Sequence, residues 1–381
     1  MPALLTAFGY VLTFCAAMYA LAAVICRARV YRPAGAPANV MVRQPVTILK
    51  PLCGDEPGLE GNLRRLCEQT HGTYQLLFGV RDRCDPAIAV VERLLACYPE
   101  RDIELVVDSR VHGTNPKVSN LINLESQARH PWLVLADSDI GVPPDYLERV
   151  SEPLADPKVG IVTCLYSGRP LAGFWSQVGA LFINTWFAPS VRVTSSFGGD
   201  CFGFGATIAI RADTLNQIGG FAAVSNRLAD DYWLGKLSRD LGLETVLSDV
   251  CVTTDVTENT LAALWSRERR WMKTIFSLNP LGYTFTFITF TFPLLVLGLL
   301  LAPTGFNLCL ALFGALARLA LHWRVPAKGV PSPGNAHLAP LRDLLLFLTW
   351  LSALTGSTVR WREQIVRVED DPSSSTTAQA S

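Results

Sequence analysis

The chain of 381 residues has no excess charge of either sign and no closely spaced cysteines. Its 33 Lys and Arg residues balance its 33 Asp and Glu residues, which argues against general nucleic-acid binding through a basic surface. Its ten cysteines are scattered, and none belongs to a Cys-x-x-Cys pair. This spacing fits neither a zinc site nor a disulfide framework, and it predicts reduced thiols that face the cytosol.

Charge is also absent from the first apolar segment. Residues 2–26 contain no Asp, Glu, Lys or Arg, and Arg27, Arg29 and Arg32 follow directly. The length suits a membrane span of about 20 residues. A cleaved signal peptide would carry positive charge before its apolar run. We therefore expect an anchor over residues 1–30, with the N-terminus outside and the following residues in the cytoplasm.

Three further apolar segments lie in the last third of the chain. Residues 281–302 and 304–321 meet at an uncharged turn and predict two spans, with Arg324 and Lys328 marking a cytoplasmic return. The segment 344–359 is shorter, and a full crossing would place the arginines after it outside. We expect a membrane region over 281–360, formed by two spans and an interfacial or re-entrant helix. A Ser/Thr-rich disordered tail is expected over 368–381.

The remaining residues, 45–280, predict an α/β domain. Short β-branched runs alternate with helical patterns, as in stacked βαβ units with a mostly parallel, Rossmann-like sheet. The ligands of such sheets gather at the carboxyl ends of the strands. The expected strands cover 46–50, 75–80, 103–107, 132–136 and 159–165, and the expected helices cover 59–69, 86–97, 116–127 and 144–152.

Two aspartates directly follow one of these strands. Asp137 and Asp139, separated by Ser138, close the apolar run 132–136. Mg²⁺ prefers one or two carboxylates together with substrate phosphate oxygens, so the pair suggests a phosphate-bearing donor delivered with its metal. For an isolated pair, a strand-end Asx turn is the alternative.

Other charged residues also lie at the ends of predicted elements. Asp85 follows the second strand, and Asp230-Asp231 opens a helix that ends before residue 242. Helix capping and the helix dipole offer structural explanations for these carboxylates. Lys50 and Lys117 stand out because the chain has only six lysines against 27 arginines. A compact ammonium group at a strand end suits a phosphate or ribose, although Lys117 also fits a solvated surface cation.

A predicted helix over 261–278 carries the last motif. Arg267, Arg270 and Trp271 stand at positions i, i+3 and i+4 and therefore share one helical face. Two guanidinium groups on one face can clamp a diphosphate, and an indole can pack beside a sugar or base. The alternative is a basic, Trp-bearing interfacial helix that precedes a membrane span.

In this order and spacing, the motifs resemble those of membrane glycosyltransferases with a GT-A fold, and more narrowly the ceramide glucosyltransferase family. Within that family the phrases look closest to the hopanoid-biosynthesis-associated branch. The Asp-Ser-Asp motif supports this, because ceramide glucosyltransferases often show Asp-x-Gly there. The resemblance rests on Ile48-Leu49-Lys50-Pro51-Leu52, Asp85-Pro86-Ala87-Ile88, Asn115-Pro116-Lys117-Val118-Ser119-Asn120-Leu121, Asp137-Ser138-Asp139, Asp230-Asp231-Tyr232 and Arg267-Glu268-Arg269-Arg270-Trp271.

The resemblance implies an inverting enzyme that moves a sugar from a UDP donor to a lipid hydroxyl with Mg²⁺ or Mn²⁺. The hopanoid-associated branch implies transfer of N-acetylglucosamine from UDP-GlcNAc to bacteriohopanetetrol, by a protein of the bacterial inner membrane whose catalytic domain faces the cytosol. The nearest alternative is glucose transfer from UDP-glucose to ceramide or diacylglycerol. The short membrane region disfavours a polysaccharide synthase, and a non-catalytic membrane scaffold is the alternative from a different class.

The resemblance also assigns roles to residues. Asp231, immediately before an aromatic residue, becomes the catalytic base with Asp230 as its rival, and Asp139 becomes the metal ligand. An aromatic helical stretch over 171–188 is expected either to lead lipid to the site, through Trp175 and Trp186, or to be ordinary core packing. The Gly-rich segment 198–205 fits either a flexible acceptor loop or tight turns. The residues expected to bind the donor are Lys50, Asp85, Lys117, Asp137, Arg267, Arg270 and Trp271.

Overall fold

The computed structural model describes residues 2–32, 44–199, 202–324, 332–355, 358–361 and 364–367. It divides into two compact units, which we call the sheet unit and the helical unit. The sheet unit comprises Arg29–Arg169 and Gly199–Asp255, and the helical unit comprises Met1–Ala28, Pro170–Gly198 and Val256–Ser381. The predicted α/β domain is therefore shared between them, because residues 170–198 and 256–280 group with the helices of the chain ends.

The sheet unit is built on one eight-stranded sheet with the order β3-β2-β1-β4-β7-β6-β8-β5. The strands β3, β2, β1 and β4 pair in parallel, whereas β7 pairs antiparallel with β4 and β6, and β5 pairs antiparallel with β8. The first half thus confirms the predicted βαβ units, and the second half makes the sheet mixed instead of mostly parallel. The strands are β1 (Val46–Pro51), β2 (Tyr74–Val80), β3 (Asp102–Val107), β4 (Trp132–Ala136), β5 (Ile140–Gly141), β6 (Val159–Pro170), β7 (Thr207–Arg211) and β8 (Glu244–Val256).

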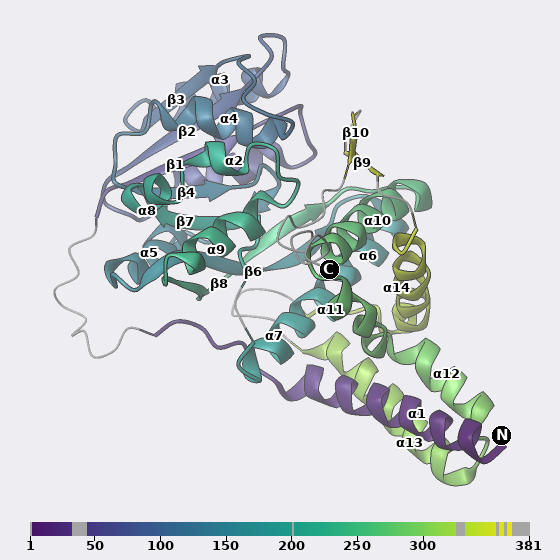
Figure 1. The fold of residues 1–381 in the computed structure, drawn as a ribbon. Helices are drawn as coiled ribbons and strands as arrows, with labels where there is room; N and C mark the ends of the chain where they lie inside the picture. The colour runs from purple at the N-terminus through teal and green to yellow at the C-terminus, as the bar shows by residue number, and fades with distance from the viewer. Residues whose placement is uncertain are drawn as a thin grey trace, which may run out of the picture. The chain divides into compact units, whose positions relative to one another are not determined.

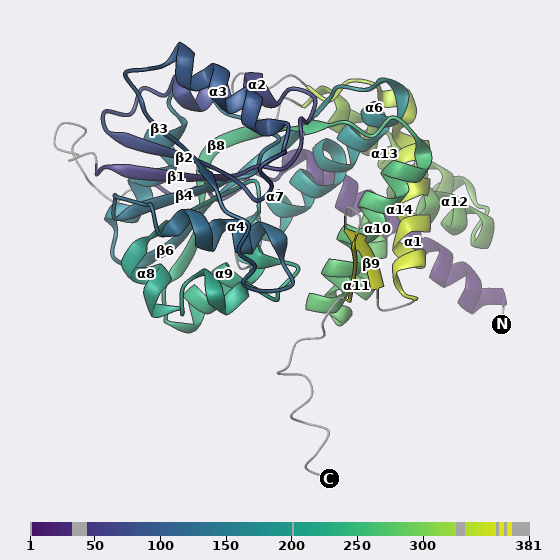
Figure 2. The same cartoon turned by 90° about the horizontal axis from the view of Figure 1, so that it is seen from above.

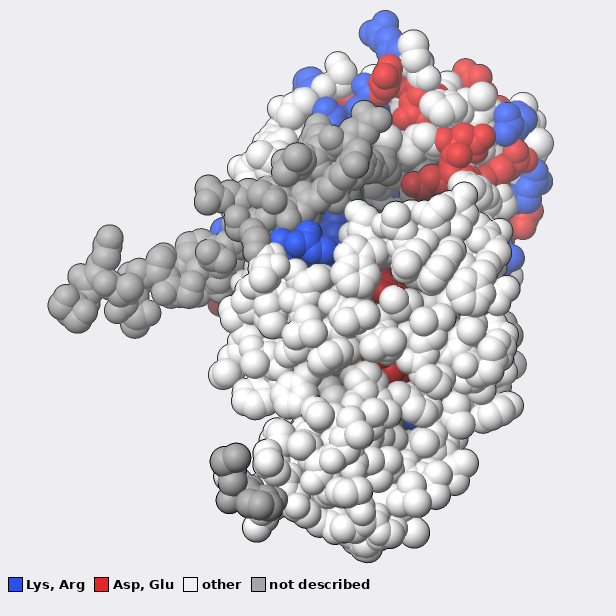
Figure 3. Space-filling view, turned by 90° about the vertical axis from the view of Figure 1, so that its right-hand side faces the viewer, with Lys and Arg blue, Asp and Glu red and all other residues white. Residues whose placement is uncertain are grey.

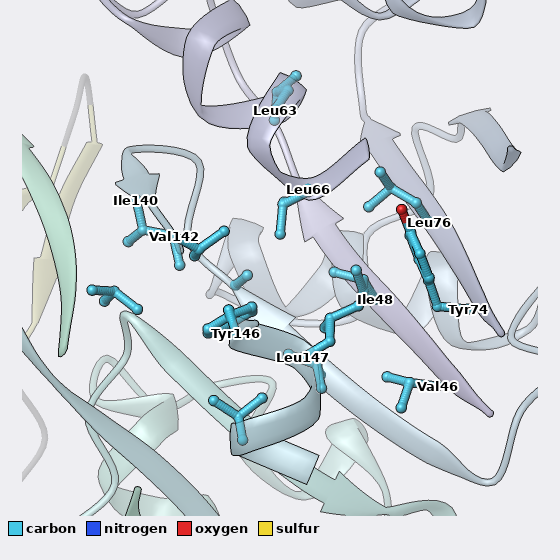
Figure 4. Close-up of a cluster of buried hydrophobic side chains, with 14 of the residues drawn as sticks. Val46, Ile48, Leu63, Leu66, Tyr74, Leu76, Ile140, Val142, Tyr146 and Leu147 are labelled. Atoms are coloured by element: carbon cyan, nitrogen blue, oxygen red, sulfur yellow. The ribbon is translucent and has the colours of Figure 1, made fainter. Parts of the chain in front are cut away.

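Helices cover both faces of this sheet (Figure 2). One face is covered by α2 (Leu59–Cys67), α3 (Ala87–Cys97) and α5 (Tyr146–Ser151), whose apolar residues pack against alternate positions of β1 and β2. Figure 4 shows part of this core, to which Val46, Ile48, Leu63, Leu66 and Tyr146 all belong. The other face is covered by α4 (Pro116–Glu125), α8 (Ala212–Gln217) and α9 (Asp230–Asp240). Burial on both faces explains why these strands are continuous apolar runs. Two short 3₁₀ turns, η1 (Glu152–Ala155) and η3 (Phe221–Val224), complete the unit.

The predicted helix starts are confirmed where a polar side chain precedes a proline. The Asn115 side chain accepts hydrogen bonds from the backbone N–H groups of Lys117 and Val118, at 2.9 and 3.1 Å, and Pro116 occupies the first turn of α4. Ahead of α3, Asp85 Oδ1 accepts a hydrogen bond of 2.9 Å from the N–H of Ala87. These caps fix the helix N-termini close to the strand ends.

In the helical unit, the N-terminal helix α1 packs along α12 and α13 (Figure 1). Large apolar side chains cover the outside of these helices, and Figure 3 shows this face almost free of charged residues. The elements are α1 (Pro2–Ile25), α6 (Gly173–Phe182), the π-helix η2 (Ile183–Phe187), α7 (Ala188–Ser196), α10 (Leu261–Leu278), α11 (Pro280–Phe285), η4 (Thr286–Thr289), α12 (Thr291–Leu301), α13 (Gly305–Ala320), η5 (Leu321–Trp323), η6 (Ala336–Leu338), α14 (Ala339–Ala353), β9 (Thr358–Trp361) and β10 (Gln364–Arg367).

Two helices of the described chain, Ala3–Ile25 and Gly305–Trp323, are long and apolar enough to cross a membrane. The segment predicted as a span over 281–302 is a bent pair of helices, Pro280–Thr289 and Thr291–Leu301, which meet at 73° and form either a broken span or a re-entrant loop. The last apolar helix ends at Ala353, before the predicted 359, and its 15 residues fall short of the roughly 20 needed to span. Lys328 and the predicted tail 368–381 lie outside the described residues.

Candidate functional site

The site is built where the order of the parallel strands reverses. The chain runs from β1 to β2 and β3 on one side and returns to β4 on the other side of β1. Such a switch point leaves a crevice at the carboxyl ends of the two central strands, where α/β proteins bind ligands. Lys50 lies near the end of β1, and Asp137 directly follows β4. The fully buried Lys50 ammonium donates a hydrogen bond to the backbone carbonyl of Asp137.

Lys117 brings two predicted carboxylates together. Its Nζ lies 2.8 Å from Asp137 Oδ1 and 3.3 Å from Asp230 Oδ2. The side chains of Lys117, Asp137 and Asp230 are 21%, 34% and 9% exposed, so this cluster is partly buried and is not an exposed surface pair. Burial opposes the charge on Lys117, but the two carboxylates outweigh it and raise the pKa of the ammonium group. The alternative of a solvated surface cation is therefore wrong for Lys117.

Asp139 faces a second acidic neighbour. Its Oδ2 accepts a hydrogen bond of 2.8 Å from Thr254 Oγ1 on β8, and the intervening Ser138 Oγ donates one of 2.8 Å to Glu56 Oε2. Burial and the negative charges of Asp137 and Glu56 raise the pKa of Asp139 to about 7, although Thr254 and Lys50 act in the opposite direction. Buried negative charge of this kind is relieved by a bound cation.

The donor set fits a hard divalent cation. Within the described ranges, no group of three or more His, Cys, Asp or Glu side chains is placed to hold a metal by itself. Mg²⁺ does not require such a cage, because it is usually held by one or two carboxylates and by substrate phosphates. The carboxylate oxygens of Asp137 and Asp139 are hard donors of this type.

Asp231 lies in the first turn of α9, directly after Asp230 of the lysine cluster. Its Oδ1 accepts a hydrogen bond of 2.8 Å from the N–H of Tyr232. A Cβ atom placed on Gly205 would lie 3.2 Å from Asp231 Oδ2 and 3.5 Å from Asp137 Oδ2. The carboxylates of Asp231 and Asp137 therefore both lie close to Gly205. Burial and the charge of Asp230 raise the pKa of Asp231 to about 6, while Lys117 lowers it.

Asp85 connects two backbone segments beside the site. Its Oδ1 accepts hydrogen bonds of 2.9 Å from the N–H groups of Gly54 and Ala87. It thereby ties the loop after β1 to the start of α3. Both bonds end on the same carboxylate oxygen, Oδ1. The predicted contact of Asp85 with the nucleotide stays a prediction.

The predicted diphosphate clamp lies in the helical unit, on α10. Arg267 Nη1 is 2.7 Å from Glu258 Oε2, and its guanidinium lies over the Trp271 ring at 5.2 Å. The shared helical face of these two residues is thus confirmed. In the described part of the chain, the buried Nε and Nη2 atoms of Arg267 have no hydrogen-bond partner. Arg270 lies on the same helix, where its carbonyl accepts a hydrogen bond from Thr274 Oγ1.

The two tryptophans assigned to the acceptor differ in environment. Trp186 is 6% exposed, its Nε1 donates a hydrogen bond of 2.7 Å to Thr289 Oγ1, and its ring packs edge-on against Phe182 at 4.9 Å. These contacts support the packing alternative for Trp186. Trp175 is only partly buried against the core of the helical unit.

Sequence reasoning missed Glu56, and it named Gly205 only as part of the Gly-rich segment 198–205. Glu56 lies in the loop after β1, so the strand-end rule that selected the other carboxylates would have found it. Gly205 lies in the Gly-rich segment, but its proximity to Asp231 depends on the antiparallel part of the sheet. Asp200 and Cys201 of that segment lie outside the described residues.

Comparisons with known proteins agree with this geometry. The family described as glycosyl transferase family 21 matches residues 8–374. Ceramide glucosyltransferase 1 of Caenorhabditis elegans is 25% identical over 236 residues, which cover 62% of this chain and 50% of that protein. The match thus spans half of that relative's length. Ceramide glucosyltransferase 3 of the same organism is 23% identical over 337 residues, or 84% of this chain and 72% of the relative.

Among solved structures, a mannosyltransferase from Pyrobaculum calidifontis, in complex with GDP-Man and Mn²⁺, superposes with a TM-score of 0.54. The two sequences are 17% identical, and the superposition covers 95% of this chain and 99% of that one. The likeness confirms the predicted GT-A fold. The helices long and apolar enough to cross a membrane are a finding on this chain itself.

Proposed function

The chain belongs to glycosyl transferase family 21, and we propose that it moves a sugar from a UDP donor to the hydroxyl of a lipid. The observation that carries this proposal is the convergence of Asp137, Asp139 and Asp231 around the end of β4, with Lys117 between two of the carboxylates. A scaffold would gain nothing from collecting partly buried carboxylates at a strand switch point, since each must be partly desolvated.

For the donor, we propose that Asp139, with Asp137 beside it, holds Mg²⁺ or Mn²⁺ against the diphosphate. When bound, the cation neutralises charge that develops on the departing diphosphate. Lys50 and Lys117 add positive charge next to Asp137. We assign the uridine to Asp85, and we assign the diphosphate and the base or sugar to Arg267, Arg270 and Trp271.

For the acceptor, we propose Asp231 as the general base. The acceptor oxygen attacks C1 of the sugar while the bond from C1 to the diphosphate oxygen breaks, and the anomeric centre inverts. Asp231 takes the hydroxyl proton during this attack, because an alcohol is too weak an acid to ionise first. The diphosphate leaves with the electron pair of the broken bond.

The pH dependence follows from the pKa of about 6 for Asp231. A base must be ionised, so kcat/KM is expected to rise about tenfold per pH unit below that value and to level off above it. Asp230, Lys117 and Asp137 face this carboxylate. Removing one negative neighbour in Asp230→Asn should lower the pKa of Asp231 and move the acidic limb to lower pH. A limb that stays in place in this variant would contradict the assignment.

A more specific proposal concerns which sugar is transferred and which lipid accepts it. The relatives at 23–25% identity are ceramide glucosyltransferases, which favours UDP-glucose and ceramide. The hopanoid-like phrases around Lys117 and Asp137 support a second candidate, transfer of N-acetylglucosamine to bacteriohopanetetrol. In either case we propose a bacterial inner-membrane protein with a catalytic domain over 45–280 that faces the cytosol and a membrane region over 281–360.

Competing donors and acceptors would test the proposal. The purified full chain in detergent is given Mn²⁺, UDP-glucose and UDP-GlcNAc together, with a short-chain ceramide or with bacteriohopanetetrol. Mass spectrometry of the lipids is expected to show one glycosylated product, and EDTA is expected to abolish it because the carboxylates alone repel the diphosphate. Addition of excess Mn²⁺ should restore the product. The absence of UDP release with every acceptor would favour a scaffold.

A further inference from the structure

Three consecutive residues near the end of β8 contact the segment that carries the proposed metal ligand Asp139. The N–H of Asp255 donates a hydrogen bond of 3.0 Å to the carbonyl of Asp139, and Thr254 Oγ1 donates one of 2.8 Å to Oδ2 of the same residue. Thr253 Oγ1 donates one of 3.1 Å to the carbonyl of Gly141. The end of β8 therefore holds both the backbone and the carboxylate of Asp139.

The register of β5 against β8 brings the Thr254 hydroxyl to this carboxylate. β5 directly follows Asp139 and has two residues, which pair antiparallel with β8 as Ile140 with Thr254 and Gly141 with Thr253. A Cβ on Gly141 would lie 2.7 Å from Thr253 Oγ1, closer than side-chain atoms approach each other. Glycine at this position thus permits the close pairing that aligns Thr254 with Asp139.

A polar cluster anchors β8 one residue beyond Thr254. Asp255 Oδ1 accepts a hydrogen bond of 2.7 Å from Arg169 Nε on β6, and its Oδ2 accepts one of 2.8 Å from Asn62 Nδ2 on α2. Arg169 Nη2 also donates one of 3.2 Å to Asn62 Oδ1. The Asp255 side chain is 1% exposed, so a shift of the strand would leave a buried carboxylate without partners. β8 is therefore a fixed support for the turn that carries Asp139.

The hydrogen bond from Thr254 makes the two carboxylate oxygens of Asp139 unequal. Within the ranges that the structure describes, Oδ2 accepts the bond from Thr254, whereas Oδ1 has no hydrogen-bond partner. Outer hydrogen bonds of this kind orient a metal ligand and strengthen its hold on the ion. We infer that Thr254 is a positioning residue, which holds Asp139 by Oδ2 and leaves Oδ1 for the divalent cation. This inference rests on the proposed function and adds the residue that orients its metal ligand.

Thr254→Val tests the inference in the purified full chain by a measurement that does not depend on turnover. Valine has a similar shape but no hydroxyl group, so Asp139 Oδ2 loses its donor. Free Mn²⁺ is followed by electron paramagnetic resonance while the protein is titrated in the presence of saturating UDP. The dissociation constant for Mn²⁺ is expected to rise about 10–100-fold, the usual effect of removing an outer partner of a metal ligand. Thr254→Ser keeps the hydroxyl and should stay within about twofold of the unaltered chain.

Thr253→Val is the matched control, because its hydroxyl bonds to a backbone carbonyl and not to the proposed metal ligand. It should bind Mn²⁺ as the unaltered chain does. Unchanged affinity in Thr254→Val would overturn the inference. An equal loss in Thr253→Val, or a loss in Thr254→Ser, would also overturn it, since the cause would then be strand packing and not the hydroxyl.

Asp139→Asn, titrated in parallel, separates this inference from the proposed function. If Asp139→Asn binds Mn²⁺ as tightly as the unaltered chain, the proposed metal site itself is wrong. If Asp139→Asn loses Mn²⁺ while Thr254→Val keeps it, Asp139 is the ligand and only the role of Thr254 is refuted.

Discussion

Asp231→Asn is expected to lower kcat for sugar transfer by about 10²–10⁴-fold, the usual contribution of a positioned general base. Asparagine has the same shape, and its oxygen can still accept the hydrogen bond from Tyr232. It cannot take a proton, so the acceptor would have to lose its proton to water. Because the donor contacts are assigned to other residues, the affinity for UDP with Mn²⁺ should stay within about twofold.

The measurement is steady-state UDP release with UDP-glucose and a short-chain ceramide, combined with calorimetric titration of UDP. Asp240→Asn is the matched control. It makes the same substitution at the other end of α9, where Asp240 is exposed and pairs with Lys236 at 3.0 Å. Its turnover should equal that of the unaltered chain, since an exposed pair of this kind contributes less than about 1 kcal/mol. If Asp230→Asn loses turnover and Asp231→Asn keeps it, the base is Asp230.

The parallel half of the fold could be predicted because its signals are local. The strands β1, β2 and β4 are mostly apolar runs. The helices α4 and α10 begin after the polar caps Asn115 and Thr260, and α9 begins with two acidic residues. The antiparallel half could not be predicted in this way. β7 lies between β4 and β6 through pairings with distant residues, and no local periodicity specifies a partner.

The break between α11 and α12 shows the same limit in the membrane region. Composition predicts one span over 281–302, but the backbone N–H of Phe292 at the start of α12 donates a hydrogen bond of 3.2 Å to Asp343 on α14. A broken helix in an apolar region needs such partners for its free N–H groups. Asp343 also pairs with Arg318 on α13 at 2.7 Å. Both partners lie far along the chain, so the sequence of the span alone gives no sign of the break.

Within the site, sequence position identified the charged residues, but their pairings needed the fold. Lys117 was expected near a phosphate, and the structure shows it between Asp137 and Asp230. The strand-end rule says which edge of the sheet a residue reaches, but it does not say which charges meet there. Glu56, whose carboxylate accepts a hydrogen bond from Ser138, belongs to the same cluster. The net charge around the metal ligand therefore became apparent only from the structure.

Arg342→Met is expected to destabilise the helical unit by about 3–5 kcal/mol, the usual effect of leaving one member of a buried ion pair alone. Arg342 is fully buried and donates hydrogen bonds of 2.7 and 2.6 Å to the two carboxylate oxygens of Glu268 on α10. It also donates one of 3.2 Å to the carbonyl of Val178 on α6. The pair thus joins α14 to α10 and α6, and its loss leaves the Glu268 carboxylate without a counter-charge.

Thermal unfolding of the full chain in detergent should show this loss as a lower melting temperature. Arg93→Met is the control, because Arg93 is 55% exposed and its pair with Glu60 lies at the surface. The double variant Glu268→Gln, Arg342→Met removes both charges and should recover much of the lost stability, since the unpaired charge causes most of the penalty. If the double variant were as unstable as Arg342→Met, packing of the arginine stem would be the cause. Because α10 also carries Arg267 and Trp271, the single variant should raise the KM for the UDP-sugar as well, and the double variant should restore it.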